Sequence, residues 1–356
     1  MARWNWPGGS PRASRRRPTR ARWRARRGFR RATQGAITAR VPLSGVYGLA
    51  AAGGQVWVIR SYRARQQSAQ LVRIDPRTGR IGLRIGLAGQ PGSITAGAGM
   101  VWLSTPSGGQ RGQIERIDAA TGRPAGVLRL PAGRCLQVSY GAGSLWAGCE
   151  VGKPDAIGFL RIDPATGHVV WRSALVHAGT QGRYGPILPV PMAAAPNGLW
   201  YATGSGVAGF AGPGLRAVSV RPPPYTISLK SAALVYSEGF VWAMAGDDGS
   251  IAKIDPATGR VLRIYTFISY LSGQGLSLAV TQGSLWLLDY ADFAYPSVLR
   301  VSITTGLPAA RAGGQRLCGG QCWQIYATPG AIWVPGATWL ARIDPARLIG
   351  PRSAPP

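Results

Sequence analysis

The sequence has few of the side chains from which catalytic and metal sites are usually built. Its 356 residues include two histidines, four cysteines and 13 acidic residues, against 41 Lys and Arg. No cysteines show Cys-x-x-Cys spacing, which argues against a zinc centre, and we expect no metal and no cofactor. His177 is a weak catalytic candidate, because no nucleophile or carboxylate is tied to it by spacing. No segment approaches the roughly 18 consecutive apolar residues of a transmembrane helix.

Tryptophan, in contrast, recurs in a fixed context. An apolar–Trp–apolar run that follows small residues, usually a glycine, occurs seven times, centred on Trp57, Trp102, Trp146, Trp200, Trp242, Trp286 and Trp333. The intervals lie between 42 and 54 residues, and a period of this length indicates a repeat architecture. We interpret the seven tryptophans as packing between repeats and not as a cofactor site, because stacked sheets need a large apolar side chain at each junction.

A second motif lies between most of these tryptophans. It reads Arg-Ile-Asp-Pro-Arg-Thr-Gly over residues 73–79 and recurs with variations in five other repeats. Asp, Pro and Gly in this order predict a tight turn, with the aspartates acting as turn formers and not as metal ligands. These aspartates are Asp75, Asp118, Asp163, Asp255 and Asp344. The fourth repeat lacks the motif, and we expect its third strand at residues 215–220.

Each repeat therefore reads as four strands, and four strands in about forty residues form one propeller blade. The predicted fold is an all-β, seven-bladed β-propeller of four-stranded blades. Residues 35–43 resemble the fourth strand of blade one, whereas the last repeat stops after its third strand. The segment 35–43 is therefore predicted to complete the last blade and close the ring. Truncation at residue 45 should unfold the protein, and truncation at residue 31 should not.

The chain divides into an arm (1–34), the propeller (35–346) and a Pro-rich C-terminal tail (347–356). Residues 1–31 contain 12 Arg and no acid, which leaves +16 of the formal net charge of +28 on the rest. Two readings of the arm stay open. It is either a disordered basic arm for nucleic acid or an anionic membrane, or the product of a misassigned start codon in a GC-rich genome. No apolar segment follows that would make it a signal peptide.

Strand alternation assigns the connections to two faces. Connections between strands 1 and 2 and between strands 3 and 4 are short and repeated, whereas the 2–3 and 4–1 connections on the opposite face vary. Binding residues concentrate on variable loops held by a rigid scaffold. The candidate ligand-binding residues on this face are Tyr62, Arg63, Arg65, Arg183, Tyr184, Asp289, Tyr290 and Asp292. The arginines and tyrosines favour anionic or aromatic ligands, and the two aspartates could bind a cation or a basic group.

The four cysteines form two local pairs. Cys135 and Cys149 fall opposite each other on adjacent predicted strands, and Cys318 and Cys322 flank a short loop. The even count favours two disulfides and an extracytoplasmic compartment, secreted or in the cell envelope. The alternative is four reduced cysteines in a cytoplasmic protein.

The alternation of Val-Trp-Val strands with Arg-Ile-Asp-Pro-x-Thr-Gly strands over residues 35–346 resembles bacterial YVTN/NHL-type propellers and the streptogramin (virginiamycin B) lyase group. The lyase resemblance implies a Mg²⁺-dependent site with His and Glu from different blades, but neither residue can be matched in the later blades here. Residues 161–171 also resemble the tryptophan-docking repeat of quinoprotein propellers. That repeat occurs in one blade, so we expect no quinone.

These patterns predict a non-catalytic, monomeric binding scaffold for a protein, peptide or polysaccharide, with its site on the face of the 2–3 and 4–1 loops. Two alternatives stay open. The first is a streptogramin-lyase-like, Mg-dependent enzyme, and the second is association with nucleic acid or an anionic membrane through residues 1–31.

Overall fold

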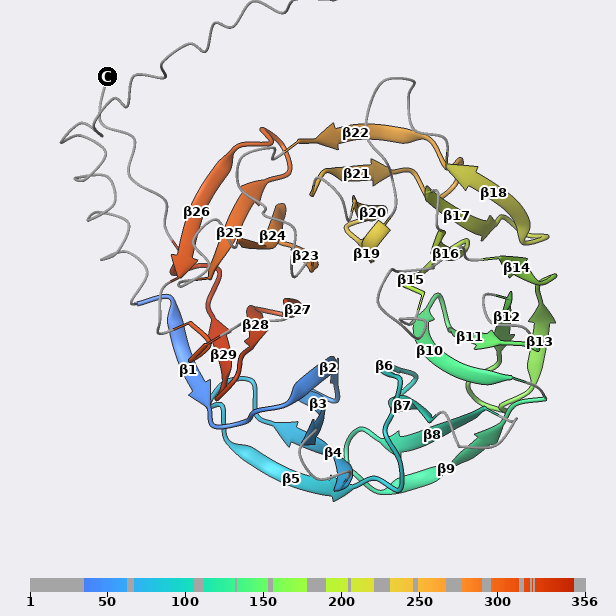
Figure 1. Cartoon of the computed structure of the whole chain (residues 1–356), viewed down its shortest axis with the longest axis horizontal. Helices are drawn as coiled ribbons and strands as arrows, with labels where there is room; N and C mark the ends of the chain where they lie inside the picture. Colours follow the sequence, from blue (N-terminus) through green and yellow to red (C-terminus); the bar gives the residue numbers. More distant parts are fainter. Residues whose placement is uncertain are drawn as a thin grey trace, which may run out of the picture.

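Seven antiparallel sheets are arranged around a ring in the computed structural model, each a blade of four strands, with a fifth strand added to blade three (Figure 1). The structure describes residues 35–348 apart from 63–66, 106–111, 132, 153–155, 178–189, 204–205, 221–230, 246–248, 267–276, 290–295, 314–316, 321 and 323. The predicted all-β, seven-bladed propeller is confirmed.

The strands follow the repeats in chain order. Blades one to three consist of β2 (Val46–Ala52), β3 (Gln55–Tyr62), β4 (Gln67–Ile74), β5 (Ile81–Gly86), β6 (Ser93–Gly97), β7 (Met100–Thr105), β8 (Gln113–Asp118), β9 (Pro124–Arg129), β10 (Arg134–Gly141), β11 (Ser144–Glu150), β12 (Ala156–Ile162) and β13 (Val169–Arg172). An additional strand of two residues, β14 (Val176–His177), pairs with β12. Blades four to six consist of β15 (Met192–Ala195), β16 (Gly198–Thr203), β17 (Gly206–Ala211), β18 (Arg216–Val220), β19 (Ser231–Ser237), β20 (Phe240–Ala245), β21 (Ile251–Ile254), β22 (Val261–Tyr265), β23 (Leu278–Thr281), β24 (Ser284–Asp289), β25 (Ser297–Ser302) and β26 (Pro308–Gly313).

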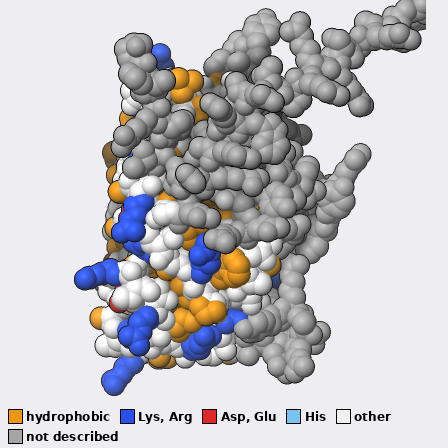
Figure 2. Space-filling view, turned by 90° about the vertical axis from the view of Figure 1, so that its left-hand side faces the viewer, with side chains coloured by type: hydrophobic (Ala, Val, Ile, Leu, Met, Phe, Trp, Pro, Cys, Tyr) orange, Lys and Arg blue, Asp and Glu red, His pale blue; other side chains and the backbone are white. Residues whose placement is uncertain are grey.

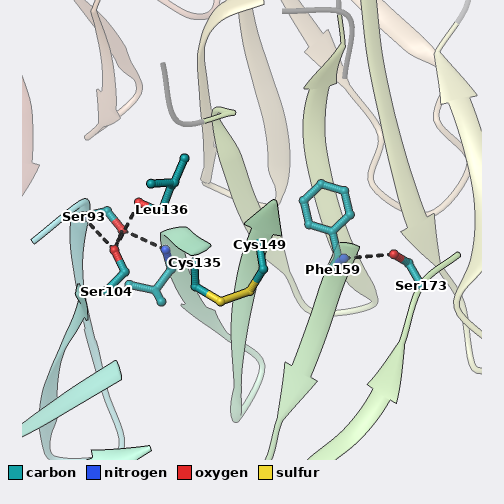
Figure 3. The surroundings of a disulfide bond; sticks show 8 residues. Ser93, Ser104, Cys135, Leu136, Cys149, Phe159 and Ser173 are labelled. Carbon is teal, nitrogen blue, oxygen red and sulfur yellow. Dashed lines mark hydrogen bonds between the residues drawn. A yellow bond between two sulfur atoms is a disulfide. The ribbon is translucent and has the colours of Figure 1, made fainter. Parts of the chain in front are cut away.

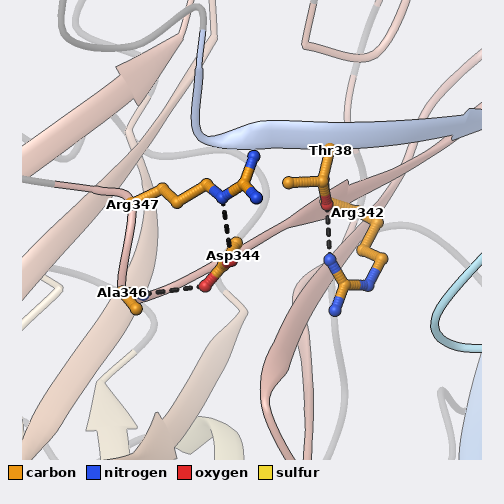
Figure 4. A network of polar contacts seen from close by, with 5 residues as sticks. All are labelled: Thr38, Arg342, Asp344, Ala346 and Arg347. Atoms are coloured by element: carbon orange, nitrogen blue, oxygen red, sulfur yellow. Dashed lines mark hydrogen bonds and ion pairs between the residues drawn. The ribbon is translucent and has the colours of Figure 1, made fainter.

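Blade seven joins the two ends of the chain. Its strands are β27 (Tyr326–Thr328), β28 (Ala331–Pro335), β29 (Leu340–Ile343) and β1 (Ile37–Val41), and β1 pairs antiparallel with β29. The Asp344 amide donates to the Ala36 carbonyl, and the Arg342 guanidinium bonds the Thr38 hydroxyl across the closure (Figure 4). The predicted closure by the N-terminal strand is therefore confirmed.

Strands 1 and 2 of every blade are joined by a two-residue turn. In five blades both turn residues have positive φ, as in Ala142 (49°) and Gly143 (71°). This is the type I′ geometry whose twist matches that of the flanking strands. Blade four has Pro196-Asn197 instead, and neither residue has positive φ, because the proline ring fixes φ at a negative value.

The turns between strands 3 and 4 are built around the repeat aspartates. In blade two, one Asp118 carboxylate oxygen accepts from the amides of Ala120 (3.1 Å) and Thr121 (2.7 Å). This confirms the role of the aspartate as a turn former. Equivalent bonds occur at Asp75, Asp163 and Asp255. The 1–2 and 3–4 turns together define what we call the turn face, and the opposite side is the loop face.

Blade four corrects one prediction. Residues 216–220 form its fourth strand, β18, and the third strand is β17, at residues 206–211. The third strand was misplaced because its sequence, Gly-Val-Ala-Gly-Phe-Ala, has little of the β-branched alternation that marks a strand. The turn that follows β17 has four residues, 212–215, whereas the corresponding turn of blade three has six, 163–168.

The tryptophans fill the junctions between blades. All seven are at most 2% exposed. Each belongs to a cluster that contains buried residues of the next blade. Trp57, for example, lies with Val101 and Leu103 of blade two, and Trp333 lies with Val56 and Val58 of blade one. Their predicted role in packing between blades is confirmed.

Both predicted disulfides are present. Cys135 and Cys149 are direct partners on β10 and β11, with Cα atoms 3.9 Å apart, and both are buried (Figure 3). Cys318 and Cys322 form the second disulfide, in blade seven. The backbone of Cys322 also forms an isolated antiparallel β-bridge with Gly336. Each disulfide links residues close in sequence, so each stiffens one blade and does not join two blades.

Candidate functional site

Two of the predicted ligand-binding residues and the weak catalytic candidate lie at the ends of strands on the loop face. Tyr62, Asp289 and His177 are the last residues of β3, β24 and β14, and the structure does not describe their side chains. The remaining candidates lie outside the described residues: Arg63, Arg65, Arg183, Tyr184, Tyr290 and Asp292. The loop-face site therefore stays a prediction.

A cross-strand pair repeats on the side of the turn face. In six blades, the tryptophan of strand 2 is directly opposite an Arg or Lys of strand 3, as in Trp146–Arg161 and Trp286–Arg300. The guanidinium carbons of Arg161 and Arg300 lie 5.8 and 5.5 Å from the centroids of their tryptophan rings, within the range of cation–π contacts. In blade four the partner of Trp200 is Gly209.

At the junction of blades six and seven, this pair is covered by the next blade. Arg300 donates from Nε to the Ser284 hydroxyl (2.9 Å) and from Nη1 to the Pro345 carbonyl (3.4 Å). Pro345 belongs to the Asp-Pro turn of blade seven. Arg73 of blade one makes the same kind of contact, with its Nη1 3.0 Å from the Ala120 carbonyl in the turn of blade two. At these two junctions, the turn of one blade therefore contacts the arginine of the blade before it.

The junction of blades three and four has the same arginine but not the same turn. Arg161 donates from Nε to the Ser144 hydroxyl (2.9 Å), as Arg300 does to Ser284. The turn that should cover it, residues 212–215, is shorter by two residues. Within the part of the chain that the structure describes, the Nη1 and Nη2 atoms of Arg161 have no hydrogen-bond acceptor.

The space left by the shorter turn is a pocket of about 320 Å³. This volume is within the range of ligand sites in proteins. We call it the blade 3–4 pocket, and its lining residues are Gly141, Ala142, Ser144, Trp146, Arg161, Ala195, Pro196, Asn197, Gly198, Gly212, Pro213 and Leu215. Both unusual turns of blade four, 196–197 and 212–215, contribute to it. A second cavity, of about 10 Å³ beside Gln137 and Met192, has room for one water molecule at most.

The wall of the pocket is rigid because aromatic rings pack behind it. Trp146 meets Trp171 edge to face, with centroids 5.9 Å apart, and Trp171 meets Phe210 at 5.0 Å. Phe210 also stacks with Tyr201 at 5.6 Å. These rings belong to strands of both blades, so they hold the two blades together although the turn contact is missing.

Among the described residues that line the pocket, Arg161 is the one that is charged. Across the ring from this pocket, Figure 2 shows Lys and Arg side chains spread over the side on which β1 and β26 lie. Buried tyrosines elsewhere are held neutral, since burial raises the pKa of Tyr47 to about 12. The turn aspartates stay ionised, because backbone amides of Thr78 and Thr121 lower the pKa values of Asp75 and Asp118.

The pocket could not have been located by a positive motif. Its signal in the sequence is the missing Asp-Pro-x-Thr-Gly turn of blade four, combined with an intact Trp–Arg pair in blade three. In the described part of the chain, no group of three or more His, Cys, Asp or Glu could hold a metal ion. The same residues contain no helix long and apolar enough to cross a membrane.

No protein-family model and no curated protein matches the chain. Several solved structures have a similar fold. BamB from Moraxella catarrhalis has a TM-score of 0.53 at 18% identity, covering 83% of this chain and 84% of its own. The computationally designed protein Ika8 has a TM-score of 0.56 at 13% identity, covering 87% and 98%. Virginiamycin B lyase from Staphylococcus aureus has a TM-score of 0.59 at 14% identity, covering 87% and 97%. At these identities the similarity shows the propeller fold alone.

Proposed function

We propose that the protein is a non-catalytic binding scaffold for a protein, peptide or polysaccharide, with its principal site on the loop face. One observation carries the proposal. On the turn face, every 1–2 turn has two residues, whereas 4–1 connections on the loop face range from four residues between β1 and β2 to 19 between β13 and β15, a connection that includes β14. A scaffold that is regular on one face and variable on the other concentrates ligand recognition on the variable face.

The proposed location of the protein is extracytoplasmic. Two disulfides in a chain with no other cysteine support it, because such bridges persist in oxidising compartments and are rare in the cytosol. The fold similarity to BamB and to a virginiamycin B lyase supports a propeller scaffold, but it does not transfer the function of either protein to this chain.

The test compares two charge-matched variants of the full chain. The double variant Arg63→Ala with Arg65→Ala removes two positive charges from the predicted loop-face site. The double variant Arg77→Ala with Arg123→Ala removes two positive charges from exposed positions on the turn face. Each protein is screened against an array of polysaccharides and a random peptide library. We expect ligands that bind the wild type and the turn-face variant but not the loop-face variant.

The opposite results would contradict the proposal. Ligands that both variants bind equally well would show that loop-face arginines do not contribute. Binding that disappears on deletion of residues 1–31 and falls steeply with salt would favour the basic arm as the interaction site, because phosphate contacts release counterions.

A further inference from the structure

The blade 3–4 pocket and the junction of blades six and seven are two versions of one structural unit. Both contain a buried tryptophan, a cross-strand arginine over its ring, and a serine that accepts the arginine Nε–H. At the junction of blades six and seven, a peptide turn of the same chain completes the unit through the Pro345 carbonyl. At the junction of blades three and four, nothing in the described part of the chain completes it.

We propose that the blade 3–4 pocket receives a short peptide turn of another protein, which carries an acidic residue and presents a backbone carbonyl to Arg161. The site lies on the turn face, so it is separate from the loop-face site proposed above. It would act as a second attachment point on the opposite side of the ring.

The shape of the pocket supports a peptide turn as the occupant. At the junction of blades two and three, Leu128 lies against Gly167 of the blade-three turn. At the junction of blades four and five, Trp200 and Val218 lie against Gly259 of the blade-five turn. The turn glycine thus packs directly on apolar side chains of the preceding blade. In the blade 3–4 pocket, Trp146 is one of the lining residues, although only 2% of its surface is exposed, and the turn of blade four is two residues shorter than that of blade three. Glycine, alanine and proline line most of the remainder, which leaves room for a backbone to approach closely.

Charge supports an acidic turn. No acidic residue is among the described residues that line the pocket, and the planar guanidinium of Arg161 is suited to carbonyl and carboxylate oxygens. The Ser144 hydroxyl accepts from Arg161 Nε, so its own hydrogen is available to an incoming oxygen. The chain has a formal net charge of +28, of which +16 lies outside residues 1–31, and this positive charge attracts an acidic segment before contact.

The probe is a head-to-tail cyclised peptide that contains Asp-Pro-Ala-Thr-Gly, the turn of this chain at residues 163–167. Cyclisation holds the turn and reduces the entropy lost on binding. Binding to the full chain is followed by isothermal titration and by saturation-transfer NMR. We expect binding to the wild type and a loss of about tenfold or more in affinity with Arg161→Gln, because a hydrogen bond to a charged group is removed.

Two further variants separate loss of the site from loss of the fold. Arg300→Gln removes the equivalent arginine at the covered junction and should leave peptide affinity unchanged. Replacement of residues 212–214 by Asp-Pro-Ala-Thr-Gly restores the missing turn while keeping Leu215, and it should abolish peptide binding in a protein that is still folded. The loop-face double variant Arg63→Ala with Arg65→Ala should bind the peptide like the wild type, so failure of this proposal and failure of the scaffold proposal are distinguishable.

Three results would overturn the proposal. One is no detectable peptide binding to the folded wild type. Another is binding that is unaffected by both Arg161→Gln and the restored turn. The third is displacement of the peptide by acetate at the same concentration, which would show that the pocket recognises an isolated carboxylate and not a turn.

Discussion

The junction of blades six and seven and the junction of blades three and four share a tryptophan, an arginine and a serine. Only at the first does the arginine bond the turn of the next blade. In the first, Arg300 reaches across to the Pro345 carbonyl, and the junction is complete. In the second, Arg161 is held by Ser144 in the same way, but a turn shorter by two residues leaves a pocket of about 320 Å³. A repeat protein can therefore form a pocket when a turn is shortened in one repeat.

The largest loss of stability is expected from removing β1, the strand that completes blade seven. Deletion of residues 1–45 removes β1, the Ala36 carbonyl that bonds Asp344, and the buried side chains of Val41 and Leu43. Each buried aliphatic side chain stabilises by about 1.5–3 kcal/mol, out of a typical net stability of about 5–15 kcal/mol. We expect an unfolded protein by circular dichroism, whereas deletion of residues 1–31 should leave the melting curve unchanged. A folded 46–356 fragment would contradict the role assigned to β1.

Restoring the missing turn should make the two junctions alike. Replacement of residues 212–214 by Asp-Pro-Ala-Thr-Gly gives Arg161 a carbonyl acceptor and releases Leu215 from its φ of 47°. A left-handed conformation costs a non-glycine residue about 1–2 kcal/mol, and a net hydrogen bond contributes about 1 kcal/mol. We expect a higher Tm in calorimetry. A Tm equal to or below that of the wild type would mean that the short turn is already well accommodated.

Replacing each of the two equivalent arginines in turn should show how much the contact with the next blade contributes to stability. Arg161→Gln and Arg300→Gln lose the same ring contact and the same serine bond, but only Arg300→Gln also loses the bond to Pro345. We therefore expect Arg300→Gln to destabilise by about 1 kcal/mol more than Arg161→Gln in urea unfolding. Equal losses would indicate that the contact with Pro345 contributes nothing.

Acid should weaken the turns that cover junctions, whereas the turn of blade four has no aspartate to titrate. The amide and hydroxyl of Thr121 hold the pKa of Asp118 below its ordinary value. Since the folded-state pKa is depressed, its contribution to stability is present above the unfolded pKa of about 3.9 and is lost as the pH falls through the folded pKa. Asp118→Asn should therefore lower the Tm at pH 7, and the difference from the wild type should shrink as the pH falls below about 4. Ser302→Ala, which removes the corresponding hydroxyl in blade six, should lower the Tm by an amount that does not change with pH.

Much of the fold was predictable from the sequence, because its signals are local and repeated. The spacing of Trp57 and its counterparts gave the blade count, and the Asp-Pro-x-Thr-Gly motif gave the turns. The likeness of residues 35–43 to the fourth strand of blade one identified the closure. The cysteine pairs were also predictable, since Cys135 and Cys149 are separated by a single hairpin.

The blade 3–4 pocket was not predictable in the same way. It depends on Arg161 and on a turn some fifty residues later, and its signal is a motif that is absent. The weak strand pattern of residues 206–211 also hid the register of blade four, so the turn at 212–215 was not recognised as a turn. The loop-face candidates, such as Arg63 and Tyr184, belong to segments without a repeated pattern and remain predictions.

The most direct test of the account compares the accessibility of the two junctions without any ligand. Arg161→Cys and Arg300→Cys each place one free thiol in a chain whose own four cysteines form disulfides. Maleimide labelling of each folded variant is followed by mass spectrometry under non-reducing conditions. We predict rapid labelling at position 161, where the pocket opens, and slow labelling at position 300, where the turn of blade seven covers the thiol. Equal labelling rates in two folded variants would contradict the claim that blade four leaves its junction open.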